Sequence, residues 1–282
     1  MSNYIDNSLI KVISFNLKRD MKMGKKNKWN ERKELAAKLI RESGASIIGV
    51  QELLPDMKED FQYILKNDYT IIGDGRYAGH KPQNDEHSDI IINNTETTVL
   101  AYKTFWLSKN PEKQSSRGTF AIFPRICTVA EIYVKEANQK IRVFNTHFDH
   151  ISGLARNLGV RIILEYMSRY NNIEPLPTIL MGDLNSKPNS HPVQILRNNL
   201  HAHKSIHLTD VYTCYSEEKL CNTFHNFKGN KNTKKNPIDY MFVSDDFEIK
   251  ESYIATDSYD GKYPSDHYPL IALLKLKKPV LA

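Results

Sequence analysis

The pattern of apolar and polar residues at the start of the chain predicts a strand followed by a helix. Residues 9–15 alternate in polarity and are rich in β-branched side chains, which is typical of a strand. Residues 29–43 carry apolar side chains at helical spacing, and Gly44 suits the left-handed conformation that commonly ends a helix. The chain therefore begins as an alternation of the two element types.

Farther along, the pattern becomes rich in strands. Residues 73–94 form a polar stretch that contains three Gly, one Pro and two His, and it predicts a long loop able to cover a small binding pocket. We expect an α/β protein, and we find no internal repeat and no Pro/Ser/Gly linker, so one domain over residues 1–282 is the prediction. The further expected elements are strands at 46–50, 98–102, 125–134, 141–146 and 178–181, helices at 56–66 and 154–170, and several short strands after Leu208.

Short polar motifs end apolar runs at six places along the chain. A strand that buries its body and presents a carboxylate, an amide or an imidazole at its end is a common way for a sheet to build a polar site. Because the motifs come from the whole length of the chain, they predict one converging pocket and hence an enzyme. They are Ser14-Phe15-Asn16-Leu17, Gln51-Glu52, Asn145-Thr146-His147, Gly182-Asp183-Leu184-Asn185, Ile238-Asp239-Tyr240 and Ser265-Asp266-His267.

The charge of the chain favours an anionic partner. The net charge is +6 and the pI is about 9.0, which fits a nucleic acid, a phosphorylated small molecule or an anionic lipid surface. Much of the excess lies in lysine-rich runs at 22–28, 228–235 and 275–278. Such runs are also typical of solvated loops and tails, so the charge alone does not identify the partner.

Cysteine content and the N-terminal segment indicate a reducing compartment. The three cysteines are odd in number and form no recurrent pattern, so a disulfide framework is not expected. Residues 1–8 lack the basic and apolar regions of an export signal. No apolar segment approaches the roughly 18 residues that a membrane span needs. We expect a cytoplasmic protein with no integral membrane segment.

Two of the motifs carry acids that suit phosphate chemistry. Glu52 at a strand end is a good ligand for Mg²⁺, which takes one or two carboxylates, although a surface or helix-capping acid is the alternative. Asp183 and Asn185 share one side of an extended segment, where the acid can orient water and the amide can hold a phosphate oxygen. Gly182 would let the backbone approach a ligand closely. The alternative for this motif is a tight turn.

The last motif places a carboxylate beside an imidazole. Asp239 can orient the ring of His267, as a general base requires, whereas a buried, hydrogen-bonded histidine is the alternative. Residues 145–150 partly match the zinc motif of metallo-β-lactamase-like hydrolases, but Asn145 stands where that motif needs His. The absence of a phosphate-binding Gly-rich loop and of a Gly-x-Ser-x-Gly elbow excludes nucleoside triphosphatases and serine hydrolases.

Taken together, the ordered motifs from Asn16 to His267 resemble the endonuclease/exonuclease/phosphatase family, whose fold is deoxyribonuclease I-like. Residues 145–150 and the Tyr-Pro-Ser-Asp-His-Tyr-Pro segment at 263–269 look most like bacterial members related to deadenylase-type nucleases. The resemblance implies a four-layer α/β/β/α sandwich of two mostly antiparallel sheets. It places the site at one edge of the sheets.

The resemblance also implies roles for individual residues. Asn16, Glu52 and Asp266 match the metal end of the site, with Glu52 the principal Mg²⁺ ligand and Mn²⁺ the alternative ion. Lys18 stands where some nucleases carry an acid, which argues against a second acidic ligand. The phosphate is expected to contact His147, Arg125 and Asn185, and an ion pair under the strand is the alternative for Arg125. Glu96 would support His147, Asp239 would pair with His267, and Asp183 completes the catalytic set.

The implied reaction is the hydrolysis of a phosphate ester by in-line attack of water. His267 is the candidate base with Asp183 positioning the water, and the sequence leaves open which of His267, Asp183 and His147 transfers the proton. A nuclease or phosphodiesterase on nucleic acid is the preferred hypothesis. A phosphatase or phosphodiesterase on a small phosphorylated metabolite or lipid headgroup is the alternative, and a non-catalytic binding module is the third.

Overall fold

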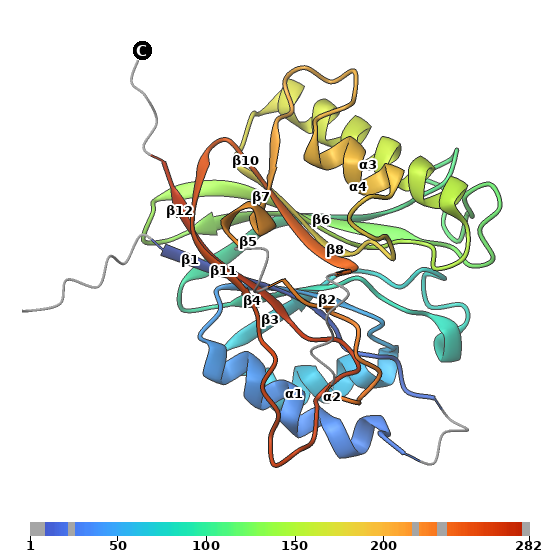
Figure 1. Cartoon of the computed structure of the whole chain (residues 1–282), viewed down its shortest axis with the longest axis vertical. Helices are drawn as coiled ribbons and strands as arrows, with labels where there is room; N and C mark the ends of the chain where they lie inside the picture. The colour runs from blue at the N-terminus through green and yellow to red at the C-terminus, as the bar shows by residue number, and fades with distance from the viewer. Residues whose placement is uncertain (1–8, 22–25, 216–219, 230–235, 278–282) are drawn as a thin grey trace, which may run out of the picture.

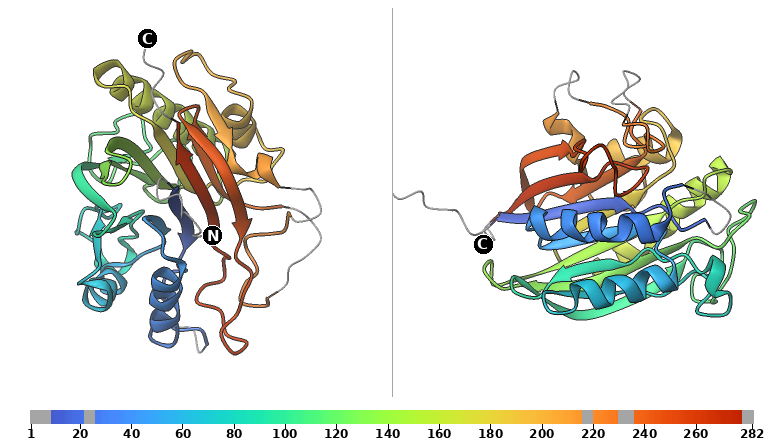
Figure 2. Two further views of the ribbon diagram at one scale, coloured as in Figure 1. Left: turned by 90° about the vertical axis from the view of Figure 1, so that its left-hand side faces the viewer. Right: turned by 90° about the horizontal axis from the view of Figure 1, so that it is seen from below.

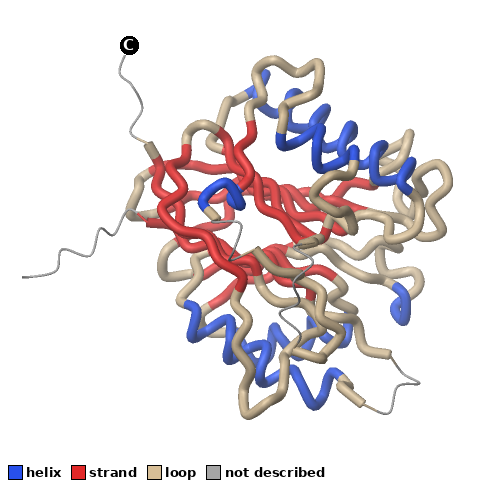
Figure 3. The backbone as a smooth tube through the Cα atoms, in the orientation of Figure 1, coloured by secondary structure: helices blue, strands red, loops and turns tan. Residues whose placement is uncertain are grey.

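Two sheets packed face to face form the centre of the molecule, and helices cover both outer surfaces. The computed structural model describes residues 9–21, 26–215, 220–229 and 236–277. Figure 1 shows one helical layer above the sheets and the other below them, with the strands between (Figure 3). The predicted four-layer α/β/β/α sandwich is confirmed. The helices are α1 (Trp29–Ser43), α2 (Pro55–Leu65), α3 (Gly153–Ile173) and α4 (His191–Arg197), with short 3₁₀ turns at η1 (Pro82–Asn84) and η2 (Val211–Cys214).

The first sheet carries α1 and α2 on its outer face. Its strand order is β11-β12-β1-β2-β4-β3, and only the β1–β2 pair in it is parallel. The first and last strands of the chain, β1 and β12, lie side by side and antiparallel (Figure 2). This pairing brings the end of the sequence to the beginning. The strands are β1 (Leu9–Asn16), β2 (Ile47–Gln51), β3 (Tyr69–Ile72), β4 (Ile90–Asn93), β11 (Phe247–Ile254) and β12 (Leu270–Leu276).

The second sheet carries α3 and α4. Its strand order is β5-β6-β7-β8-β10-β9, and only the β7–β8 pair in it is parallel. One parallel pair per sheet, among otherwise antiparallel neighbours, agrees with the expected mostly antiparallel architecture. The strands are β5 (Thr97–Trp106), β6 (Ile126–Val134), β7 (Gln139–His147), β8 (Thr178–Asp183), β9 (Leu208–Asp210) and β10 (Asp239–Ser244).

Alternating side chains of the strands build two cores. In β1, Val12 packs into the core that the two sheets share, whereas Ile13 packs against the helices on the outer face. Both side chains are fully buried, and a buried aliphatic side chain contributes roughly 1.5–3 kcal/mol. The period of two along the strand therefore decides which layer each residue joins.

Polar side chains join the two sheets at one end. Asn145 of β7 donates from Nδ2 to the carbonyl oxygens of Val50 (2.9 Å) and Asp89 (2.8 Å) of the facing sheet. Gln51 donates to Oδ1 of Asn145 at 2.7 Å. A Cβ atom on Gly49 would lie 2.8 Å from the Asn145 side chain, so glycine is needed for this close approach. Both sheet ends are thus fixed relative to each other.

Some elements differ from the sequence expectations. The loop expected over residues 73–94 ends in strand β4, which pairs with β2 and β3. Strand β3 and helix α4 were not expected, because each is short. The N-terminal segment 1–8 and parts of the lysine-rich runs at 22–28, 228–235 and 275–278 lie outside the described residues. Within the described part of the chain, none of the helices is long and apolar enough to cross a membrane.

Candidate active site

Strand register places three of the predicted residues side by side. His147 ends β7 and Asp183 ends the parallel strand β8, and they are register partners. Asp239 begins the antiparallel strand β10 and lies opposite Asp183 in that ladder. One imidazole and two carboxylates therefore occupy adjacent positions at one end of the second sheet.

Asn16 and Glu52 reach the same place from the first sheet. The side-chain amide of Asn16 donates from Nδ2 to Oδ2 of Asp183 (3.0 Å) and to Oε1 of Glu52 (3.2 Å). The backbone N–H of Arg19 donates to Oε2 of Glu52 at 2.9 Å. Glu52 has a φ of 58°, a left-handed conformation that is uncommon for a residue with a side chain and is often found at functional sites. Asn16 thus links the acids of the two sheets.

Ser265, Asp266 and His267 come to the site from the other end of the sequence. The Ser265 hydroxyl donates to the carbonyl oxygen of Asn16 at 2.6 Å, because β12 pairs with β1. His267 contacts Oδ2 of Asp239 through Nδ1 at 2.8 Å, as the sequence suggested. Asp239 begins its strand and His267 precedes its strand, so neither residue lies at a strand's end. The antiparallel direction of β10 and β12 nevertheless brings them to the same edge.

Shifts in pKa give the groups of this cluster different protonation states at neutral pH. Burial by itself would lower the pKa of His267, but the carboxylates of Asp239, Asp183 and Asp266 raise it to about 10. Burial and the neighbouring Asp239 raise the pKa of Asp183 to about 7. Burial would also raise the pKa of Glu52, yet Lys18, the Arg19 N–H and nearby groups hold it below the usual value. At neutral pH His267 is therefore an imidazolium, and Asp183 is poised to gain or lose a proton.

His147 is neutral and held by Asn185. Burial and the positive charges of Arg125 and other nearby groups lower the pKa of His147 well below its usual value. Nδ2 of Asn185 lies 2.9 Å from Nε2 of His147 and donates to the carbonyl oxygen of Phe148 at 3.0 Å. Since the amide nitrogen only donates, Nε2 accepts and the ring proton lies on Nδ1. In this arrangement Asn185 orients His147.

A basic wall lies beside His147. Nη2 of Arg125 lies 2.9 Å from Nδ1 of His150, and Nε lies 3.9 Å from Oδ2 of Asp149. Arg125 thus forms an ion pair, which was the alternative to phosphate contact, although the pair is a loose one. Arg125 also lines the pocket. In the loop before β4, Glu86 accepts from both Arg19 and Arg76. The loop expected over residues 73–94 therefore does form one wall of the site.

Glu96 does not belong to this site. It is exposed in the turn between β4 and β5, where it accepts a hydrogen bond from Ser46. Ser46 precedes β2 whereas Glu52 follows it, so Glu96 lies at the opposite end of the first sheet. The prediction that Glu96 supports His147 is wrong, because the turn carries this acid away from the catalytic edge. Asn185 is the residue that contacts His147.

Gly182 also has a different role from the one its motif suggested. A Cβ atom at this position would lie 1.9 Å from the carbonyl oxygen of Thr146, on the neighbouring strand β7. Its φ of 145° lies in the region that favours glycine. Gly182 therefore permits close packing between β7 and β8, and it is not among the residues that line the pocket.

The converging side chains line a cavity of about 610 Å³, a size in the range of small-molecule sites. Several residues of its walls were not predictable from the sequence, since Arg19, Arg76 and Glu86 lie in loops that carry no motif. Two aromatic side chains, Phe123 and Phe224, add apolar surface at the pocket. The lining residues are Lys18, Arg19, Met21, Glu52, Arg76, Glu86, Phe123, Arg125, His147, His150, Asp183, Asn185, Phe224, Ile238, Asp266 and His267.

The acidic end of the cavity suits a hard divalent cation. Oδ1 of Asp266 and Oδ1 of Asp239 are buried and have no hydrogen-bond partner, and Glu52 adds a further carboxylate. Ligand atoms of Asp183, Asp239 and His267 also lie within 4.8 Å of one another. His267 and Asp239 already bond each other, however, which leaves the carboxylate oxygens as the better donors. Oxygen donors of this kind select Mg²⁺ or Mn²⁺.

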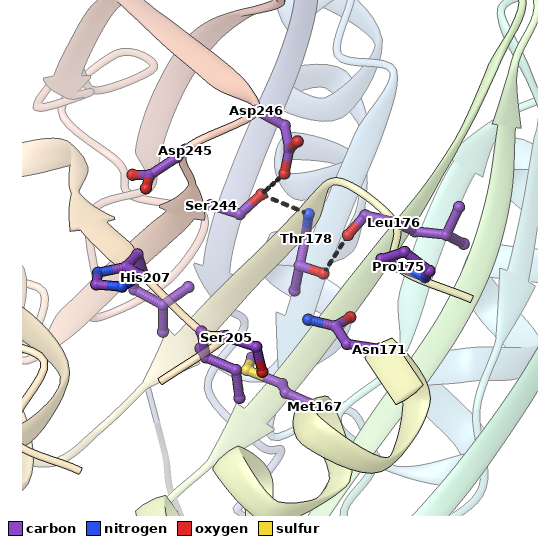
Figure 4. A pocket seen from close by; sticks show the side chains of 12 residues that line it. Met167, Asn171, Pro175, Leu176, Thr178, Ser205, His207, Ser244, Asp245 and Asp246 are labelled. Atoms are coloured by element: carbon purple, nitrogen blue, oxygen red, sulfur yellow. Dashed lines mark hydrogen bonds between the residues drawn. The ribbon is translucent and has the colours of Figure 1, made fainter. Parts of the chain in front are cut away.

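A second cavity of about 240 Å³ lies at the far end of β8 and β10, beside Thr178 and Ser244 (Figure 4). Ser244 donates to Asp246 at 2.7 Å and accepts from the backbone N–H of Thr178 at 2.9 Å (Figure 4). These hydrogen bonds give Ser244 and Asp246 a structural role in a turn between strands. The chemistry is concentrated at the other end of the sheet.

The site offers a place for a cation next to neutral and positively charged donors, which fits a phosphate ester held beside a metal ion. The four-layer sandwich is a fold of phosphoesterases. The chain belongs to the endonuclease/exonuclease/phosphatase family, whose model matches residues 13–267. Members of this family are phosphoester hydrolases and generally depend on divalent metal ions. The resemblance drawn from the six motifs is confirmed.

Solved structures of bacterial proteins are similar over nearly the whole chain. A family protein from Bacteroides thetaiotaomicron shares 29% identity with a TM-score of 0.84, and the match covers 96% of each chain. A mannosyl-6-phosphatase from the same organism shares 29% identity with a TM-score of 0.82, covering 94% of this chain and 99% of that one. The catalytic domain of human Nocturnin, at 15% identity, 96% and 95% coverage and a TM-score of 0.74, shares the fold. A search of curated protein sequences gave no match.

Proposed function

We propose that this protein is a divalent-metal-dependent phosphatase that acts on a small phosphorylated compound. One observation carries the proposal: a cavity of about 610 Å³ is lined both by carboxylates, among them Glu52 and Asp266, and by basic side chains, among them Arg125. A phosphate group fits between a cation at the acidic end and the Arg125 side of the pocket. The similarity to a mannosyl-6-phosphatase supports a sugar phosphate or a compound of similar size as the substrate.

Glu52, with Asn16 and Asp266 beside it, would hold the metal ion. The bound ion would act as a Lewis acid that neutralises charge on the phosphate. Arg125 binds the phosphate group in this proposal, and neutral His147 contacts it from the adjacent strand. These assignments agree with the roles that the family resemblance implied for the same residues.

The pKa values distribute the proton chemistry of the proposed reaction. Asp183, with a pKa of about 7, accepts the proton of the attacking water, since a base works best when its pKa lies near the operating pH. His267, with a pKa of about 10, stays positively charged beside Asp239 and stabilises charge on the phosphate oxygens. This assignment replaces the earlier expectation that His267 is the base, because His267 already carries a proton at neutral pH.

Hydrolysis of nucleic acid is the second candidate, and the net charge of +6 favours it. The lysine-rich runs that supply much of this charge fall partly outside the described residues. The pocket of the described residues, at about 610 Å³, has the size of a small-molecule site, which favours a small ester.

A substrate panel with Mg²⁺ or Mn²⁺ tests the proposal. The panel holds hexose 6-phosphates, inositol phosphates, sphingomyelin, single-stranded RNA, plasmid DNA and an abasic duplex, and a Glu52→Ala variant serves as control. We expect inorganic phosphate to be released from a small ester by the wild type and not by the variant or after chelation of the metal. Cleavage of a nucleic acid alone would retain the site and overturn the substrate class.

A further inference from the structure

Lys18 occupies an unusual position among the acids of the pocket. Its ammonium nitrogen lies 3.4 Å from Oδ2 of Asp266, and its charge is the strongest of those that lower the pKa of Glu52. The Lys18 side chain is 33% exposed and lines the cavity, whereas the Asp266 side chain is 2% exposed. Within the described part of the chain, the ammonium group makes no hydrogen bond of its own. It is therefore free to donate to a ligand.

The backbone around Lys18 is held in place by several contacts. Lys18 has a φ of 56°, in the left-handed region, and its N–H donates to Oδ1 of Asn16 at 2.9 Å. Arg32, which is 2% exposed, donates to the carbonyl oxygens of Lys18 at 2.7 Å and of Pro264 at 2.8 Å. A conformation that is sparsely populated persists only where its surroundings fix it, and such positions cluster at functional sites.

We infer that the Lys18 ammonium contacts the phosphate group of the substrate and supplies a second positive charge beside a single divalent ion. The inference rests on the proposed function. One divalent cation balances the charges of Glu52 and Asp266, which leaves the charge of a phosphate dianion to be met by fixed cations. Lys18 reaches the acidic end of the pocket and lies beside Asp266, whereas Arg125 does not contact Asp266. The same ammonium repels a second metal ion, so we expect one metal ion per site.

A purely structural ion pair between Lys18 and Asp266 is the competing explanation. Lys33 provides the comparison, since its ammonium bonds Asp60 at 2.8 Å outside the pocket and its side chain is 26% exposed. A structural pair of Lys18 with Asp266 would influence stability and, through Asp266, metal affinity, but it would not influence phosphate binding. Exposed pairs contribute little to stability in any case.

The test compares Lys18→Met, Lys18→Arg and the matched control Lys33→Met with the wild type. Calorimetric titration with Mn²⁺ gives the number of bound ions and their affinity, and titration of the Mn²⁺-loaded proteins with inorganic phosphate gives the anion affinity. We expect one ion per wild-type chain, Mn²⁺ affinity at least tenfold tighter in Lys18→Met, and phosphate affinity at least tenfold weaker. Lys18→Arg should recover part of the phosphate affinity, and Lys33→Met should match the wild type.

Kinetics complete the test, because kcat of Lys18→Met should fall at least 100-fold on the substrate that the panel identifies. Two Mn²⁺ ions in the wild-type pocket, or an unchanged phosphate affinity in Lys18→Met, would overturn the inference. A wild type that binds Mn²⁺ but hydrolyses no ester of the panel would contradict the proposed function. Because the two titrations do not depend on turnover, they decide the role of Lys18 in either case.

Discussion

Asp183 and Asp239 lie directly opposite each other in the antiparallel ladder between β8 and β10, so two buried carboxylates face one another at the catalytic edge. Like charges in this position oppose the ionisation of both groups. His267 relieves part of the repulsion by bonding Asp239 at 2.8 Å. Asp183 lies farther from His267, at 3.9 Å from Nε2, and burial together with the charge of Asp239 raises its pKa to about 7. A strand register thus produces a carboxylate that can take a proton at neutral pH.

Replacing Asp183 with Asn should separate activity from stability. The Asp183→Asn variant loses the proposed base, and we expect kcat to fall by roughly 10³, within the range typical of general-base catalysis. It also loses the charge opposite Asp239, so at pH 8 the free energy of unfolding should rise by about 1–3 kcal/mol. Steady-state kinetics and urea unfolding of the same preparations measure both quantities.

Asp210→Asn is the matched control for that experiment. Asp210 is also a buried acid at a strand end, but its Oδ2 bonds Arg197 at 2.6 Å outside the pocket. This control should lose stability and keep its kcat. A stabilised, fully active Asp183→Asn variant would remove Asp183 from the chemistry.

The raised pKa of His267 predicts how stability depends on pH. Its pKa is about 10 in the folded protein against the ordinary 6.5, so its contribution is complete below pH 6.5 and is lost as the pH rises through 10. The raised pKa of Asp183 acts between its ordinary 3.8 and about 7, which leaves the range from 7 to 10 to His267. The melting temperature of the wild type should fall across this range, and that of His267→Gln should fall less. Parallel curves for the two proteins would show that His267 is not protonated in the metal-free fold.

The site motifs were predictable from sequence because each is a contiguous polar string next to an apolar run. Asn16, Glu52, His147, Asp183 and His267 all meet in one pocket. The expectation that every motif follows its strand was wrong for two of them. Direction within a sheet depends on pairing between distant segments, which a local pattern does not encode.

The walls of the pocket were not predictable in the same way. Glu86 and Arg76 come from a polar loop without periodicity, and their meeting with Arg19 depends on how that loop folds over the sheet edge. Glu96 fails for a related reason. It follows an apolar run as the true site acids do, but the turn it occupies lies at the wrong end of β4. The spacing of residues along the sequence identifies the ends of strands. It does not show at which end of the sheet each strand end lies.

The ion pairs of Glu86 predict a change in substrate binding. Glu86 accepts from Arg19 and Arg76, and the Arg19 backbone bonds Glu52, so the charge on Glu86 links the loop wall to the metal end. Glu86→Gln keeps the shape but removes the charge that orients both arginines. We expect KM to rise about tenfold with a smaller change in kcat, since the geometry of the wall is shared by the ground and transition states.

Glu131→Gln provides the control for Glu86→Gln. Glu131 bonds the buried Arg142 at 2.8 Å on β6, in a similar arginine–glutamate pair away from the pocket. Its KM should equal that of the wild type. An unchanged KM in Glu86→Gln, or an equal rise in both variants, would show that the loop wall does not bind substrate.

Gly182→Ala should destabilise the protein by more than the strained backbone conformation alone would cost. The added Cβ atom would lie 1.9 Å from the Thr146 carbonyl oxygen, which is a backbone atom of the adjacent strand and has little room to move. Gly79→Ala is the control, because Gly79 has a φ of 84° but no heavy atom within 4 Å of the new Cβ. The control should lose only the roughly 1–3 kcal/mol expected for a residue with a side chain in this region. Gly182→Ala should lose at least twice as much or fail to fold, because β7 and β8 must separate. Urea unfolding of both variants measures the difference, and equal losses would mean that β7 and β8 are packed less closely than this register requires.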